Sequence, residues 1–203
     1  MSGEELLLGF DGRVWGNPDT WDAKRREQFL LRIDVAQPFS TDTTVWPSVL
    51  GSDLRPPTCI GHQTLWNDLE CLQSCLTSSR TTPSWILAGV TLHLIDDLSE
   101  EVDRWKSDVP APSPSSRAQA WSLLGYDVSD RWLLSGLSNC GFLPGEDVQA
   151  VRKKWSDKLN DYHLFEKLDS AIEFRALSDQ RVLEHSPFFI FGIWSIRSGS
   201  SGA

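Results

Sequence analysis

The sequence predicts an α+β fold, in which helices pack against a single mixed or antiparallel sheet. Strand-like and helix-like segments interleave along the 203 residues without the regular alternation of a parallel α/β protein. No glycine-rich phosphate-binding loop follows any strand-like segment. The run PFFIFGIWSI at residues 187–196 is almost continuously apolar, which predicts a strand buried on both faces at the centre of the sheet.

Two strands are expected near the beginning of the chain, at residues 6–10 and 29–36, where apolar side chains precede a turn or alternate with polar ones. Residues 37–57 are rich in proline, serine and threonine and predict a surface loop. A helix is expected at residues 64–78, because leucines recur at spacings of four, three and four residues. Thr64 is its expected N-cap.

Residues 85–95 predict a strand with Val90 and Leu92 facing the core and Thr91 and His93 facing solvent. A short acidic helix is expected at residues 99–106. The segment SDVPAPSPSS at residues 107–116 contains three prolines and four serines, so it predicts an exposed loop within one domain that spans residues 1–197. The Ser-Gly tail at residues 198–203 is expected to be flexible.

The stretch WSLLGYDVSDRWLLSGLSNCGF at residues 121–142 combines several features of a functional site or an unusual core. It predicts a strand, a Gly-Tyr turn at residues 125–126 and a short helical segment that carries Trp132. Two further helices are expected. One spans residues 144–159, and the other begins at Ser170, which has capping-box spacing to Glu173.

Composition and charge limit the possible partners. The formal net charge of −9 disfavours nucleic acid, whose binding requires clustered Lys and Arg, and favours a basic partner. Ten tryptophans indicate a large aromatic core with some rings left for a partner surface. The sequence shows no secretory signal and no apolar run of membrane-spanning length. We therefore expect a cytoplasmic protein with no membrane partner and with four reduced cysteines.

Four zinc-type ligands lie within 17 residues of each other, at Cys59, His62, Cys71 and Cys75. Their spacing matches no standard zinc motif, and two of the thiols lie beside the leucine stripe of the expected helix. Cysteine commonly acts as a small apolar residue in such a place. The sequence therefore favours buried thiols and no bound cofactor, with zinc binding as an alternative.

A cysteine-dependent hydrolase is a second alternative. It would use Cys140, in a tight Ser-Asn-Cys-Gly turn, with one of the histidines 93, 163 or 185 and with Asp96 or Asn139. No GxSxG motif accompanies the serines. We expect His185 instead to fix the turn before the last strand by bonding to a neighbouring carbonyl or carboxylate group.

Acidic residues recur near the ends of the expected strands, where they are suited to a protein partner. Charged rims steer association, and aromatic side chains supply the buried anchors of an interface. The partner-binding residues expected on this basis are Asp96, Asp97, Asp127, Asp130 and Trp132. No catalytic residue is expected.

Three segments of the chain are similar to segments of a known class of bacterial proteins. The segments are LLGYDVSD at residues 123–130, LSGLSNCGF at 134–142 and EHSPFFIFGIW at 184–194. They resemble small acidic immunity proteins, which are encoded beside polymorphic or contact-delivered toxins. The resemblance implies a cytoplasmic inhibitor that binds a cognate toxin and performs no chemistry. Carbohydrate binding through exposed tryptophans is a further alternative, and the oligomeric state stays open.

Overall fold

The computed structural model describes residues 5–14, 58–60, 63–78, 85–95, 98–108, 119–131, 136, 154–155, 157–162 and 164–198. The strand expected at 29–36, the loop at 37–57 and most of the helix expected at 144–159 lie outside these residues. So does most of the proline-serine loop, from residue 109 onward. In the described residues, helices pack against a four-stranded antiparallel sheet, which confirms the α+β prediction.

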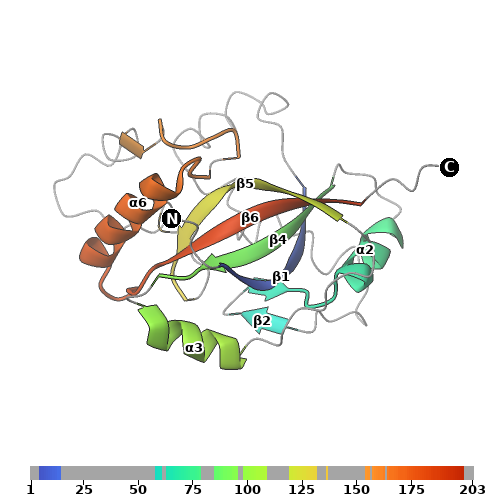
Figure 1. Ribbon diagram of the computed structural model, residues 1–203, viewed down its shortest axis with the longest axis horizontal. Coiled ribbons are helices and arrows are strands. Elements are labelled where there is room, and N and C mark those ends of the chain that lie inside the picture. Colours follow the sequence, from blue (N-terminus) through green and yellow to red (C-terminus); the bar gives the residue numbers. More distant parts are fainter. Residues whose placement is uncertain are drawn as a thin grey trace, which may run out of the picture.

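The main sheet contains β1 (Glu5–Val14), β4 (Trp85–His93), β6 (Phe189–Ser198) and β5 (Gln119–Ser129), in that spatial order. Each neighbouring pair is antiparallel. As the almost continuously apolar sequence predicts, β6 is an interior strand, between β4 and β5 (Figure 1).

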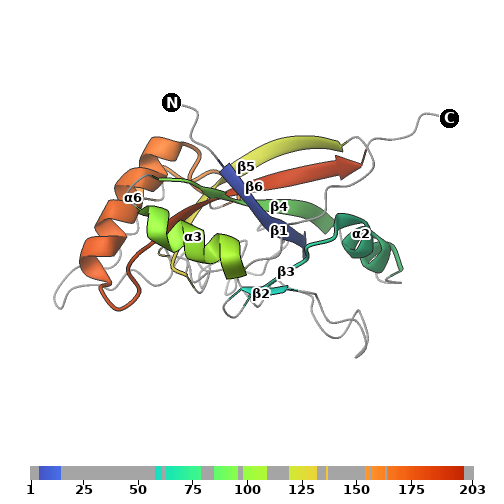
Figure 2. The same ribbon diagram turned by 60° about the horizontal axis from the view of Figure 1, so that its bottom comes forward.

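A short hairpin and three helices complete the described fold. The hairpin consists of β2 (Thr58–Ile60) and β3 (Gln63–Leu65), and the helices are α2 (Leu69–Ser78), α3 (Ser99–Asp108) and α6 (Leu168–Arg181). Two views place α6 and α2 at opposite ends of the sheet (Figures 1 and 2). The sheet is therefore covered by separate elements rather than by one continuous helical layer.

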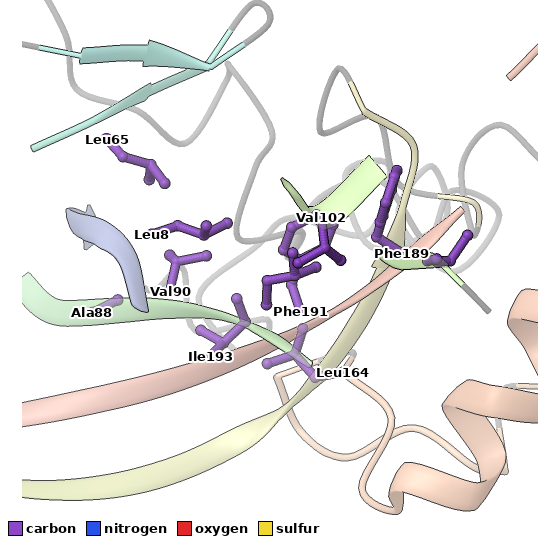
Figure 3. Packing of buried hydrophobic residues seen from close by; sticks show 11 residues of the cluster. Leu8, Leu65, Ala88, Val90, Val102, Leu164, Phe189, Phe191 and Ile193 are labelled. Carbon is purple, nitrogen blue, oxygen red and sulfur yellow. The ribbon is translucent and has the colours of Figure 1, made fainter. Parts of the chain in front are cut away.

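One face of the sheet packs against α3 and the hairpin. Every second residue of β4 and β6 contributes to this core, as expected for strands whose side chains alternate between faces. The side chains lie together on one side of the strands (Figure 3). The buried members of this cluster are Leu8, Leu65, Ala88, Val90, Leu92, Leu98, Val102, Leu164, Phe189, Phe191 and Ile193.

The opposite face carries two separate apolar clusters. At one end, Val128 and Ile190 pack with α6 residues Ala171 and Phe174. At the other end, Phe10 and Ile196 pack with Leu69 and Leu72 of α2 and with Trp66, which lies shortly before that helix. Between the two clusters, the middle of this face carries other side chains of β4, β5 and β6, which the strand register places side by side.

The outer edges of the sheet are both partly paired. On β1, the backbone N–H groups of Phe10 and Trp66 each donate to the other residue's carbonyl oxygen, with both N–O distances at 2.8 Å. On β5, Tyr126 and Phe165 exchange equivalent bonds of 2.9 and 2.8 Å. Such pairing satisfies edge groups that would otherwise be available to another strand.

The expected N-terminus of the helix at 64–78 is wrong. Thr64 lies in β3, opposite Cys59, and α2 begins only at Leu69. The cap is Asp68, whose Oδ1 accepts a hydrogen bond from the Cys71 N–H at 2.8 Å. The leucine spacing identifies the buried face of a helix but not its first residue. Aspartate and threonine are both good N-caps, so the sequence does not decide between Asp68 and Thr64.

Two other local predictions are corrected by backbone geometry. The last helix begins at Leu168, so Ser170 lies inside its first turn and cannot be the cap. Gly125 and Tyr126 form no turn, because β5 continues through them with a bulge between Leu123 and Gly125. The φ angle of Gly125 is +151°, and a Cβ atom there would lie 2.7 Å from the Leu164 Cβ, which favours glycine.

Candidate functional site

The residues predicted to bind a partner are only partly described. Asp96, Asp97 and Trp132 lie outside the described residues, and their role stays a prediction. Asp127 and Asp130 are buried, with 1% and 0% of their surface exposed. Their expected place on an exposed acidic surface is therefore wrong, because carboxylates without solvent contact form no charged surface in the free protein.

Asp127 and Asp130 both make side-chain hydrogen bonds at the end of β5. Asp127 accepts hydrogen bonds from the Val128 N–H and from the Ser129 hydroxyl group, both at 2.9 Å. The Asp130 Oδ2 atom lies 2.6 Å from the Nδ1 atom of His185. This pair joins the end of β5 to the turn before β6, which confirms that His185 fixes that turn through a carboxylate.

The two cysteine hypotheses are not decided by the described residues. Cys71 is an exposed free thiol on α2 rather than a buried one. His62, Cys140 and His163 lie outside the described residues, as do the side chains of Cys59 and Cys75. Within the described part of the chain, no three potential ligands lie close enough to hold a metal ion.

A group of aromatic and polar side chains lies in the middle of the sheet face between α2 and α6. Antiparallel partners share a face, so the register places Leu123 beside Trp194, Tyr126 beside Gly192, and Thr91 also beside Gly192. Trp121 and Glu5 lie on this face as well. We name these residues the central sheet face: Glu5, Thr91, Trp121, Leu123, Tyr126 and Trp194.

Trp121 lies flat across the sheet. A Cβ atom built on Gly89 of β4 would lie 2.4 Å from the Trp121 Cζ3 atom, so the indole reaches over β6 to the far side of the strand. Its ring also meets Phe10 edge to face, with centroids 6.1 Å apart. Yet Trp121 is 37% exposed, and so is Leu123. One side of the Trp121 ring therefore packs on the sheet, and another part of the ring is in contact with solvent.

Beside this surface, three side chains form a hydrogen-bonded chain. The Thr91 hydroxyl group donates to the Glu5 Oε2 atom at 2.8 Å and accepts from the Trp194 Nε1–H at 3.0 Å. Gly192 lies directly below, because its missing Cβ would come within 2.6 Å of the Thr91 Oγ1 atom. The chain holds a carboxylate in a fixed position on the sheet.

The strand pattern predicts that Thr91 and His93 face solvent, but both are buried, with 7% and 9% of their surface exposed. They do lie on the opposite face from Val90 and Leu92, as the alternation predicts. Thr91 bonds to the side chains of Glu5 and Trp194, and His93 lies opposite Glu5 on the neighbouring strand. A strand pattern identifies the face of a residue, but the burial of that face depends on what packs there.

The Glu5 charge affects Tyr126 on the neighbouring part of the face. Burial raises the pKa of Tyr126 above the ordinary value of 10.0, and the negative charge of Glu5 raises it further. Because unfolded tyrosine ionises at the ordinary value, this shift implies that folding stability decreases as the pH rises through 10.

We expect this shift to be measurable, because Tyr126 and Tyr162 are the only tyrosines in the sequence. In a Tyr162→Phe variant, phenolate absorbance should develop above pH 10. Adding Glu5→Gln should lower the pKa of Tyr126 only in part, since burial is the larger cause. A titration at the ordinary tyrosine pKa in both variants would contradict the geometry.

The close contact between Gly89 and Trp121 predicts a strong coupling between the two positions. Gly89→Ala should lower the free energy of unfolding by about 1–3 kcal/mol, because the new methyl group displaces the indole. In a Trp121→Ala background the same change should cost much less. Denaturant unfolding of the four proteins gives the coupling energy, and additive effects would show that the ring does not lie over Gly89.

Comparisons with known proteins give no relative: no protein-family model matches the sequence, and no match was found among curated proteins or solved structures. In the described ranges, no helix is both long and apolar enough to cross a membrane.

The central sheet face was not identified from the sequence. In the sequence, Trp121 only begins a strand-like run, and no local pattern distinguishes Glu5 or Trp194 from other residues of their strands. One signal was present, because Gly89 and Gly192 interrupt two strongly apolar strands. An isolated glycine in a strand often marks a place where another group approaches closely.

Proposed function

We propose that the protein is a non-catalytic binding protein of the immunity type, which neutralises a basic bacterial toxin by covering its active site. The observation that carries this proposal is Trp121, an indole that is fixed on Gly89 and Phe10 but remains 37% exposed. Tryptophan is among the side chains most enriched at the energetic centre of protein interfaces.

The bracing of Trp121 favours binding for an energetic reason. A side chain that is already held in one conformation loses little rotational freedom when a partner covers it. Leu123 is equally exposed beside it on β5, which enlarges the apolar surface. The two residues can therefore provide a compact anchor for a partner without rearrangement of the sheet.

Charge supports a basic partner. The chain has a formal net charge of −9, and Glu5 contributes a carboxylate to the same sheet face. An acidic protein accelerates encounter with a basic one through long-range attraction, and this effect weakens as salt increases. Nuclease-like toxins have basic active sites that fit such a surface.

The proposal is tested by co-expressing the protein in bacteria with a toxin encoded by the neighbouring gene. The wild-type protein should protect the cells, and Cys140→Ala should protect equally, because an inhibitor does not need a nucleophile. Trp121→Ala should protect poorly while remaining folded. Loss of protection with Cys140→Ala, together with normal protection by Trp121→Ala, would favour the hydrolase alternative instead.

A further inference from the structure

We propose that Glu5, Thr91 and Trp194 form a binding site for an arginine side chain. This inference rests on the proposed function, because the arginine would belong to the basic partner that covers the central sheet face. It specifies which chemical group of that partner is recognised and where. The site lies next to the exposed pair Trp121 and Leu123, on the same face.

The hydrogen-bonded chain fixes only one of the two carboxylate oxygens of Glu5. Oε2 accepts from the Thr91 hydroxyl group at 2.8 Å, and the Trp194 indole N–H donates to that hydroxyl at 3.0 Å. Among the described residues, Oε1 has no hydrogen bond and no lysine or arginine forms an ion pair with Glu5. The carboxylate is therefore oriented but not neutralised within the described part of the chain.

A carboxylate in this setting favours a cation. Glu5 is half-buried, and its charge contributes to the raised pKa of Tyr126, which lies on the same sheet face but on β5. A negative charge that is only partly hydrated and not paired gains stability when a cation approaches it. The site therefore favours a positively charged group over an apolar or negatively charged one.

The aromatic rings around Glu5 favour arginine over lysine. The half-buried rings of Trp194 and Tyr126 lie on the same face, because Tyr126 is the cross-strand partner of Gly192 and Trp194 lies two residues further along β6. A planar guanidinium group can stack on an aromatic ring and still donate several N–H bonds to a carboxylate. Lysine has a compact, strongly hydrated ammonium group and makes fewer directed bonds.

His93 supplies a second polar group at this place. It is the direct cross-strand partner of Glu5, and its Nδ1 atom is buried without a hydrogen-bond partner in the described structure. Buried polar atoms usually have partners, so an unpaired one beside an oriented carboxylate is consistent with a missing ligand.

The test uses N-acetylarginine amide as the probe and N-acetylcitrulline amide as its uncharged counterpart of nearly the same shape. Binding is followed by the NMR signal of the Trp194 indole N–H, assigned with Trp194→Phe. In the wild-type protein, the arginine compound should move this signal in a saturable way and the citrulline compound should not. The lysine compound should bind more weakly.

Glu5→Gln keeps the side-chain shape and an oxygen acceptor for Thr91, and it should weaken arginine binding by about tenfold or more, equivalent to about 1.4 kcal/mol. Glu100→Gln, at an exposed position of α3, is the matched control and should bind as the wild type does. Equal responses to arginine and citrulline in the wild-type protein would overturn the proposal, even if Glu5→Gln does not fold. An unchanged affinity in a folded Glu5→Gln variant would also overturn it.

These outcomes are distinct from those that test the proposed function. If the neighbouring toxin is not bound at all, the proposed function fails, whereas the arginine titration still reports on the site. If the toxin is bound through Trp121 but the arginine compound leaves the Trp194 signal unmoved, only the arginine site is wrong.

Discussion

Phe174→Ala is expected to lower the free energy of unfolding by about 3–5 kcal/mol, which is the usual cost of removing a fully buried phenylalanine ring. Phe174 is 0% exposed on α6. Its ring centroid lies 4.9 Å from that of Trp155 and 5.1 Å from that of Phe165. The three rings connect α6 with the segment that pairs with the edge of β5, so a cavity here weakens several elements together.

The matched control is Ile172→Ala, on the same helix but 43% exposed. It should change stability by no more than about 1 kcal/mol, because little buried surface is lost. Urea unfolding of both variants, followed by circular dichroism, gives the comparison. Similar losses for the two substitutions would mean that α6 does not pack through Phe174.

His185→Ala is expected to cost about 3 kcal/mol, because it removes a partner from a buried carboxylate. Asp130 is 0% exposed, whereas 26% of the His185 side chain reaches solvent. The histidine is thus partly in contact with solvent, and its Nδ1 atom lies 2.6 Å from the Asp130 Oδ2 atom. Without the imidazole, the Asp130 carboxylate loses this bond at a place where its own side chain has no solvent contact.

The double variant Asp130→Ala with His185→Ala separates this effect from simple loss of packing. It should be less destabilised than the sum of the two single variants, since no buried charge is left without its partner. Thermal unfolding of the four proteins at neutral pH measures the difference. Strict additivity would show that the two side chains act independently.

Much of the sheet was predictable because its strands are strongly patterned. The apolar run of β6 indicated an interior strand, and the alternation in β4 separated Val90 and Leu92 from Thr91 and His93. These signals are local, so the sequence carries them directly. The first residues of helices were harder to predict from the sequence. Asp68 and Thr64 are both suitable N-caps, and only the tertiary structure selects Asp68.

The candidate site was less predictable because it depends on contacts between distant residues. The hydroxyl of Thr91 meets Glu5 across 86 positions of sequence and Trp194 across 103 positions. The recurrence of acidic residues near the ends of the expected strands predicts that Asp130 lies on an acidic surface. Asp130 is instead buried and bonds to His185, 55 positions away, and no local pattern indicates that pairing.

The most direct measurement of the central claim is the dissociation rate of the complex with the neighbouring toxin, for Trp121→Ala and for Ile172→Ala. The two residues are similarly exposed but lie on different elements, β5 and α6. If the central sheet face binds the toxin, Trp121→Ala should dissociate at least about 30-fold faster, which corresponds to about 2 kcal/mol, with little change in association. Ile172→Ala should dissociate as the wild type does. Equal dissociation rates for wild-type protein and a folded Trp121→Ala variant would contradict the account.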